Sequence, residues 1–173
     1  VIAKNLKTAK IFHDFFKNKR IIKLYLAVIC PPPSKNEQYI ESNIEKSSFS
    51  KVRKMTTSNV KGKFAKTYMK TLVKNSKYAL VLLYPITGRT HQLRVHMNYI
   101  QCSIIGDKKY KLNENSQDKE NFLKLHSYII KFPKEDFIKA PLPEHFKNFL
   151  KENKLDFDFK KIEKNYLKEF QYE

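Results

Sequence analysis

The hydrophobic pattern is clearest in the middle of the chain. The apolar run over residues 78–84 is rich in Leu and Val and is too short for anything but a strand. Pro85 and Gly88 follow this run and should end the strand in a tight turn. Thr90 comes next, and its hydroxyl can cap a helix by accepting a free backbone N–H of the first turn. The pattern therefore predicts a buried strand, a turn, and a helix from Thr90 to about Ile100.

The predicted helix has two different faces. Its apolar face repeats at i, i+4 and i+7 and consists of Leu93, Met97 and Ile100. Its polar face consists of His91, Arg94 and Asn98. The start of a helix favours anions through its free N–H groups and its dipole, and the arginines at 89 and 94 add two planar donor forks. On these grounds alone, a solvated basic corner and a site for phosphate or nucleic acid are equally good interpretations.

The rest of the pattern predicts an α+β fold around a mostly antiparallel, mixed central sheet flanked by helices and loops. Strands are expected over residues 20–30, 67–72 and 123–132, with the end of another at 1–4. Helices are expected from Asn5 to about Asn18, after residues 140–143, and near the end of the chain, where Phe159, Ile162, Tyr166 and Phe170 share a face. Residues 31–50 should form a loop or a weak hairpin, and residues 113–121 a surface loop.

Charge indicates a polyanionic partner. The 173 residues suit one domain, and they carry 35 Lys and Arg against 17 Asp and Glu, a net charge of +18. This excess favours RNA or DNA and, less readily, an anionic membrane surface. The densest basic stretch covers residues 51–66 and includes Lys51, Arg53, Lys54, Lys61 and Lys63. It can be either a solvated surface or a loop that contacts phosphates without reading sequence.

The sequence gives no indication of a metal, a cofactor or a membrane span. Cys30 and Cys102 are isolated, which fits a reducing compartment and neither a zinc site nor a disulfide framework. His91 and His96 are five residues apart and cannot share a helix face as a ligand pair would. No apolar run approaches membrane-spanning length. We therefore expect no metal, no cofactor and no membrane partner.

Several motifs resemble one enzyme family. The run PITGRTHQLRVH at 85–96, followed by IIGDKKY at 104–110, resembles the signature of the RluA-type RNA pseudouridine synthases. Lys-x-Tyr-x-Ala at 23–27, Gly-x-x-Ala-x-Thr at 62–67 and Leu-His-Ser at 125–127 resemble further motifs of that family, with Ser127 in place of its usual Ala. The resemblance implies a pseudouridine synthase fold and the conversion of uridine to pseudouridine in rRNA or tRNA, through a flipped-out base and without metal or cofactor.

The resemblance also implies roles for individual residues. Arg94 matches the family arginine that pairs with a catalytic aspartate, and Tyr25 matches the tyrosine that lies against the target base. Taken alone, without the resemblance, Tyr25 is better interpreted as an ordinary half-buried strand residue. The residues expected to bind RNA or substrate are Lys23, Arg89, Thr90, His91 and Gln92, together with Lys51, Arg53, Lys54, Lys61 and Lys63.

The family's catalytic aspartate has no counterpart in this chain. The family carries it in a His-Arg-Leu-Asp motif just ahead of a strand whose tail residues 1–4 resemble. We therefore expect residues 1–173 to be an N-terminally incomplete catalytic domain, with the aspartate upstream, and the chain alone to be inactive. Arg94 should then face an empty position or a substitute anion. The alternative function is a non-catalytic RNA-binding module or a ribonucleoprotein component. We expect an intracellular monomer, cytoplasmic or organellar (mitochondrion or plastid).

Overall fold

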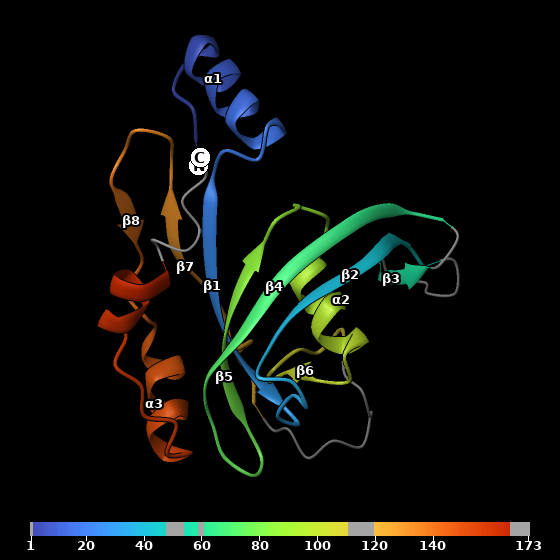
Figure 1. The fold of residues 1–173 in the computed structure, drawn as a ribbon, viewed down its shortest axis with the longest axis vertical. Coiled ribbons are helices and arrows are strands. Elements are labelled where there is room, and N and C mark those ends of the chain that lie inside the picture. The colour runs from blue at the N-terminus through green and yellow to red at the C-terminus, as the bar shows by residue number, and fades with distance from the viewer. Residues whose placement is uncertain (1, 48–53, 59–60, 111–119, 167–173) are drawn as a thin grey trace.

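A computed structural model describes residues 2–47, 54–58, 61–110 and 120–166 (Figure 1). The first half of the chain forms α1 (Leu6–Lys17), β1 (Ile22–Cys30), β2 (Glu37–Lys46), β3 (Met55–Ser58), β4 (Lys63–Lys74) and β5 (Ala79–Pro85). The second half forms α2 (Gln92–Tyr99), β6 (Ser103–Ile104), β7 (Leu125–Lys131), β8 (Phe137–Lys139), α3 (Glu144–Glu152) and a π-helical turn, η1 (Ile162–Tyr166).

The strands form one sheet in the order β3-β2-β4-β5-β1-β7-β8, and β6 pairs with β1. Every strand pairing within the described residues is antiparallel. β5 lies between β4 and β1, and all seven of its residues are buried. The predicted α+β class and the predicted buried strand before the turn are therefore confirmed. A short apolar run suits the middle of a sheet, because strands on both sides and packing on both faces exclude it from water.

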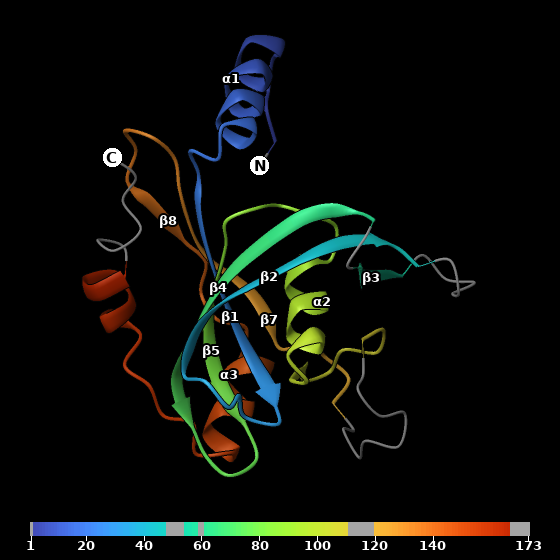
Figure 2. The same ribbon diagram turned by 45° about the vertical axis from the view of Figure 1, so that its right-hand side comes forward.

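Each face of the sheet carries its own hydrophobic core. On one face Leu24, Leu26 and Val28 of β1 pack in a core with Phe146 and Phe149 of α3. On the other face, Ala27 and Ile29 of β1 share a core with the predicted apolar face of α2. Figures 1 and 2 show α2 and α3 on either side of the sheet. Because alternate residues of β1 point to opposite faces, the side that carries Tyr25 is the side covered by α2.

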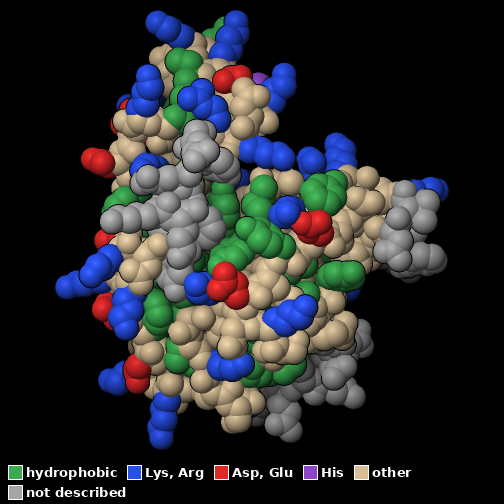
Figure 3. Space-filling view, viewed as in Figure 1, with side chains coloured by type: hydrophobic (Ala, Val, Ile, Leu, Met, Phe, Trp, Pro, Cys, Tyr) green, Lys and Arg blue, Asp and Glu red, His purple; other side chains and the backbone are tan. Residues whose placement is uncertain are grey.

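α1 extends away from the sheet (Figure 1). It begins as the sequence predicts, because the Asn5 side chain accepts a hydrogen bond from the Thr8 backbone N–H at 2.8 Å. None of its residues is buried, and one of its contacts with the body is between the rings of Phe12 and Phe132, whose centroids are 4.9 Å apart. On the face drawn in Figure 3, Lys and Arg side chains are spread from α1 to the opposite end of the molecule rather than gathered in one patch.

The structure corrects two expectations about secondary structure. Residues 37–46 form the ten-residue strand β2, paired with both β3 and β4, instead of a loop or weak hairpin. Residues 2–4 are not a strand, and Ile2 is 94% exposed. The last predicted helix is described only in its first part, which contains η1, and its residues after 166 lie outside the described residues. The predicted loop at 113–121 lies mostly outside the described residues.

Candidate active site

The turn between β5 and α2 is built differently from the prediction. Thr90 does not cap the helix: α2 starts at Gln92, and His91 before it takes the left-handed conformation with φ of 56°. The Gln92 side chain reaches back instead, and its Oε1 accepts the Arg89 backbone N–H at 2.9 Å. Thr90 is exposed. The turn is therefore stabilised by a buried amide rather than by a hydroxyl cap.

Gln92 joins the turn to β4. Only 3% of Gln92 is exposed. Its Nε2 donates to the Lys66 carbonyl and to Thr67 Oγ1, both at 2.9 Å. Its Oε1 accepts a hydrogen bond from Thr87 Oγ1 at 2.7 Å. Thr87 Oγ1 in turn accepts the Lys66 backbone N–H at 2.9 Å. Because buried polar groups cost free energy when left unpaired, this set of bonds fixes the turn against the sheet.

His96 continues the same buried network on the next turn of α2. Its Nδ1 lies 2.8 Å from Thr67 Oγ1 and its Nε2 lies 3.2 Å from Ser42 Oγ. Burial lowers the pKa of His96 from 6.5 to about 4, because the charged imidazolium would lose its hydration. His96 is therefore neutral at pH 7 and joins α2 to β4 and β2.

A cavity of about 270 Å³ opens beside this turn. It is lined by Lys23 and Tyr25 of β1, by Pro85, Thr87, Gly88, Arg89 and His91 of the turn, by Gln92, Leu93 and Arg94 of α2, and by Leu125 of β7. Its size is just below the roughly 300–1,000 Å³ of sites for drug-sized ligands, so it suits a smaller group such as one nucleobase. The described residues that line it include three cations and no carboxylate.

Lys23 lies between this cavity and a second one of about 370 Å³, which it lines together with Thr87, Gly88 and Arg89. Burial lowers the pKa of Lys23 below its usual value. Arg89 Nε donates to the Phe64 carbonyl at 2.9 Å, which holds its guanidinium beside β4. Lys23 and Arg89 therefore line both cavities, and two cations in this position favour an anionic group.

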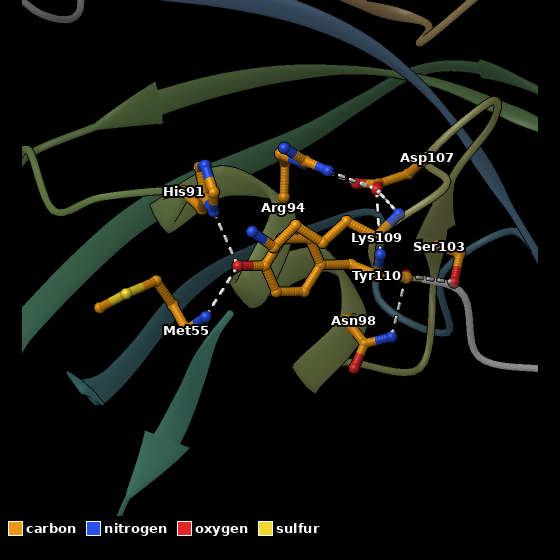
Figure 4. A network of polar contacts seen from close by, with 8 residues as sticks. All are labelled: Met55, His91, Arg94, Asn98, Ser103, Asp107, Lys109 and Tyr110. Atoms are coloured by element: carbon orange, nitrogen blue, oxygen red, sulfur yellow. Dashed lines mark hydrogen bonds and ion pairs between the residues drawn. The ribbon is translucent and has the colours of Figure 1, made fainter. Parts of the chain in front are cut away.

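Arg94 has a carboxylate partner within the chain. Its Nε donates to Asp107 Oδ2 at 2.7 Å and its Nη2 donates to Asp107 Oδ1 at 2.6 Å (Figure 4). The hydrogen bonds that Arg94 donates to Asp107 raise the pKa of Arg94. Burial alone would raise the pKa of Asp107, but the bonds from Arg94 and from backbone N–H groups lower it overall. The expectation that Arg94 faces an empty position or a foreign anion is therefore wrong.

The structure brings six of the predicted site residues together around the cavity: Lys23, Tyr25, Arg89, His91, Gln92 and Arg94. It does not place the others there. Lys54 borders a different cavity beside β3, with its ammonium 5.6 Å from the centre of the Tyr110 ring, and Lys61 and Lys63 are exposed around the start of β4. Lys51 and Arg53 lie outside the described residues. The contributions of these residues to binding stay predictions.

Asp107 and Tyr110 were not predicted as site residues. The Tyr110 hydroxyl lies 2.8 Å from His91 Nδ1 and accepts the Met55 backbone N–H at 2.9 Å, so it joins the turn to β3 (Figure 4). The available signal was the Gly-Asp-x-x-Tyr spacing at 106–110, which follows Arg94 closely in the sequence. In the part of the chain that the structure describes, no three His, Cys, Asp or Glu side chains group as metal ligands would, and no helix is long and apolar enough to cross a bilayer.

Comparisons with known proteins indicate the family of the chain. A model of the family described as RNA pseudouridylate synthase matches residues 1–99, more than half of the chain. The chain is 38% identical over 154 residues to ribosomal large subunit pseudouridine synthase C of Rickettsia bellii, covering 84% of the chain and 50% of the relative. It is 36% identical over 154 residues to ribosomal large subunit pseudouridine synthase D of Borreliella burgdorferi, covering 87% of the chain and 47% of the relative.

One shorter relative and one solved structure extend the comparison. An uncharacterized RNA pseudouridine synthase of Zymomonas mobilis is 34% identical over 149 residues, which cover 84% of the chain and 68% of the relative. The structure of human RNA pseudouridylate synthase domain containing 4 superposes with a TM-score of 0.71 at 26% identity, over 85% of this chain and 67% of that one. The chain spans about half the length of the first curated relatives it matches. On the family match and this fold, the chain belongs to the RluA-type RNA pseudouridylate synthase family.

Proposed function

We propose that this chain forms the base-binding part of an enzyme that isomerises uridine to pseudouridine in RNA. The observation that carries the proposal is the cavity in which Tyr25 and Arg94 lie together among cations and apolar side chains. The relatives named as ribosomal large subunit synthases support ribosomal RNA as the substrate, and we retain tRNA as the other candidate.

In this mechanism Tyr25 offers a ring face to the extruded uracil. A flipped base loses its stacking partners, and an aromatic side chain replaces part of that lost contact. Apolar contributions from Leu93 and Leu125 in the same lining exclude water from the base. Because uridine and pseudouridine are isomers, the reaction needs no oxidant, reductant or group donor: the C–N glycosidic bond breaks, the base turns, and the sugar bonds to a ring carbon.

A carboxylate must act at the sugar or at the base, as nucleophile or as base. We propose that it is an aspartate of a segment preceding Val1, as in the family motif, so that residues 1–173 are the distal part of a catalytic domain. The Nε and Nη2 bonds to Asp107 leave the Nη1 edge of the Arg94 guanidinium to receive this second carboxylate.

The charge of the chain supports an RNA partner. A net charge of +18 attracts the phosphate backbone, and Lys23 and Arg89 border the cavity in which the nucleotide would lie. We propose that the lysines near β3 and β4, with Lys51 and Arg53, contact phosphates outside the cavity. We also propose that the protein acts as a monomer inside the cell, without metal or cofactor.

The test follows release of tritium from RNA that carries ³H at uracil C5, because that hydrogen leaves when C5 bonds to the sugar. The full-length protein with its preceding segment should turn over, and the 173-residue chain alone should not. Arg94→Ala in the full-length protein should abolish turnover and leave RNA affinity largely intact. Arg20→Ala, which changes an exposed arginine stacked on Phe15, is the matched control and should keep wild-type rates. Turnover by the short chain would show that another residue supplies the chemistry.

A second function, RNA binding without catalysis, is favoured by one observation. None of the described residues that line the cavity is acidic. The same assay separates the two functions, because a non-catalytic module would bind RNA in a salt-dependent manner and release no tritium even as the full-length protein.

A further inference from the structure

We propose that Asp107 is a positioning residue of the reaction: it holds the Arg94 guanidinium in one orientation, so that the remaining N–H edge is directed at the carboxylate that acts on the base. This inference rests on the proposed function. The pair is bidentate, with both carboxylate oxygens of Asp107 bonded to different nitrogens of Arg94 (Figure 4). A bidentate fork fixes direction as well as distance.

Asp107 itself has no access to a substrate. Its side chain is 1% exposed, whereas that of Arg94 is 20% exposed and lines the cavity. Beyond the two bonds from Arg94, Asp107 Oδ1 accepts the backbone N–H groups of Lys109 at 2.9 Å and Tyr110 at 3.0 Å. A carboxylate with four donors around it is buried and ionised, so it acts through Arg94 and not on the reacting atoms.

The turn that carries Asp107 is rigidly attached to the strand that carries Tyr25. The Ile105 N–H donates to the Val28 carbonyl of β1 at 2.9 Å, and the Lys124 N–H donates to the Ile105 carbonyl at 2.8 Å. Gly106 has φ of +75°, and a Cβ at this position would lie 2.2 Å from the Phe122 carbonyl oxygen. Only glycine fits such a position. Asp107 therefore positions Arg94 relative to β1, and hence relative to the base that Tyr25 would contact.

The other side of Arg94 is also fixed. Its guanidinium carbon lies 4.8 Å from the centre of the Tyr110 ring, and Tyr110 belongs to the same turn as Asp107. Cation–π contact of this kind adds to the carboxylate bonds. Two side chains from one five-residue segment thus surround Arg94, which leaves the guanidinium little freedom to rotate.

The experiment uses the full-length protein. Asp107→Asn keeps the size of the side chain and an acceptor for the turn, but it removes the charge and one Arg94 acceptor. We expect kcat to fall about 100-fold, as when a reacting group is slightly misplaced, with RNA Kd changed less than about threefold. Because Arg94→Ala leaves no turnover to compare, the coupling is measured in an Arg94→Lys background, in which Asp107→Asn should cause no further loss of kcat. A merely structural role predicts instead a loss of folded protein and an additional loss in that background.

A second readout does not require turnover. In ¹⁵N-arginine-labelled protein, the Arg94 Nε–H proton should exchange with water at least about tenfold more slowly than that of exposed Arg20, and Asp107→Asn should remove this protection. If Asp107→Asn fails to fold, Arg94→Lys replaces it in the kcat measurement, because lysine keeps the charge but cannot make the bidentate pair. Slow exchange dependent on Asp107 in a protein without turnover would support the positioning and refute the proposed function. Fast Arg94 exchange, or unchanged kcat in a folded Asp107→Asn variant, would overturn the inference.

Discussion

His96 makes the stability of the fold depend on pH. Its ring is fully buried between Thr67 and Ser42. Gln92 already donates to Thr67 Oγ1, so the Thr67 hydroxyl proton is available to His96 Nδ1, and Nε2 then carries the ring proton toward Ser42. Protonating Nδ1 would place two donors against each other in a buried site. The neutral ring is therefore the form that fits.

The sign and the size of this pH dependence follow from the linkage between protonation and folding. The pKa of His96 is 6.5 in the unfolded chain and about 4 in the folded one, so between these values the unfolded state binds more protons. The stabilising contribution is complete above pH 6.5 and is lost as the pH falls. At pH 5 the loss is 1.5 pKa units at ~1.4 kcal/mol each, about 2 kcal/mol of the free energy of unfolding. It grows to about 3 kcal/mol at pH 4.

The assay is urea unfolding of the chain at pH 7 and pH 5, followed by circular dichroism. Glu37 and Asp107 stay ionised between pH 7 and pH 5, because their pKa values are lowered. Their contributions to the free energy of unfolding are lost only at still lower pH. His96→Gln should reduce stability at pH 7 but flatten the change between the two pH values. His13→Gln, on an exposed part of α1, is the control and should keep the wild-type change. An equal pH dependence in wild type and His96→Gln would refute the reasoning.

Four further outcomes are expected. Tyr25→Ala in the full-length protein should slow tritium release about 10- to 100-fold, because base–aromatic stacking is worth ~1–3 kcal/mol, while Tyr25→Phe keeps the ring and should retain most of the rate. Gln92→Met should lower the free energy of unfolding, measured in urea, by about 2–4 kcal/mol, since it leaves the buried partners of the amide unpaired. Gly106→Ala should lower the free energy of unfolding by about 3 kcal/mol or more in the same assay, because the new Cβ would clash with Phe122. Gly88→Ala should lower it by less than about 1 kcal/mol, because the nearest atom to the new Cβ, Lys23 Nζ, is 3.8 Å away. RNA affinity in filter binding should fall about 10³-fold or more between 50 and 200 mM salt if six or more phosphates are contacted, and an affinity indifferent to salt would contradict the basic-surface proposal.

The elements that were predicted correctly are those with a strong local signal. The Asn5 cap, the strand within residues 20–30, the apolar run of β5 and the helix after residues 140–143 each depend on residues close together in sequence. The fold class follows from their order. These parts could be predicted because local propensity and tertiary packing favour the same conformation.

The elements that were missed depend on distant partners. In β2 only Ile40 and Ile44 are buried, so the strand lacks a clear alternating pattern and exists because it pairs with β4 and β3. Thr90 has the right chemistry for a cap, but the Gln92 amide reaches the Arg89 N–H and the turn takes a different conformation. The sequence motif located both Arg94 and Asp107, but it does not reveal that the two side chains contact each other.

The Arg94–Asp107 pair gives Arg94 a counter-charge within the described residues. A partly buried guanidinium that has no counter-charge costs free energy on folding. Without a carboxylate of the chain beside it, the guanidinium would need an anion from solvent. Asp107 supplies this counter-charge from within the fold. The pair has no net charge, so Arg94 adds little to the general attraction of phosphates, whereas Lys23 and Arg89 line the cavity without an ion pair to a carboxylate of the described residues. We therefore propose that the roles are divided: Lys23 and Arg89 favour the RNA backbone, and Arg94 keeps a directed donor edge for one specific carboxylate.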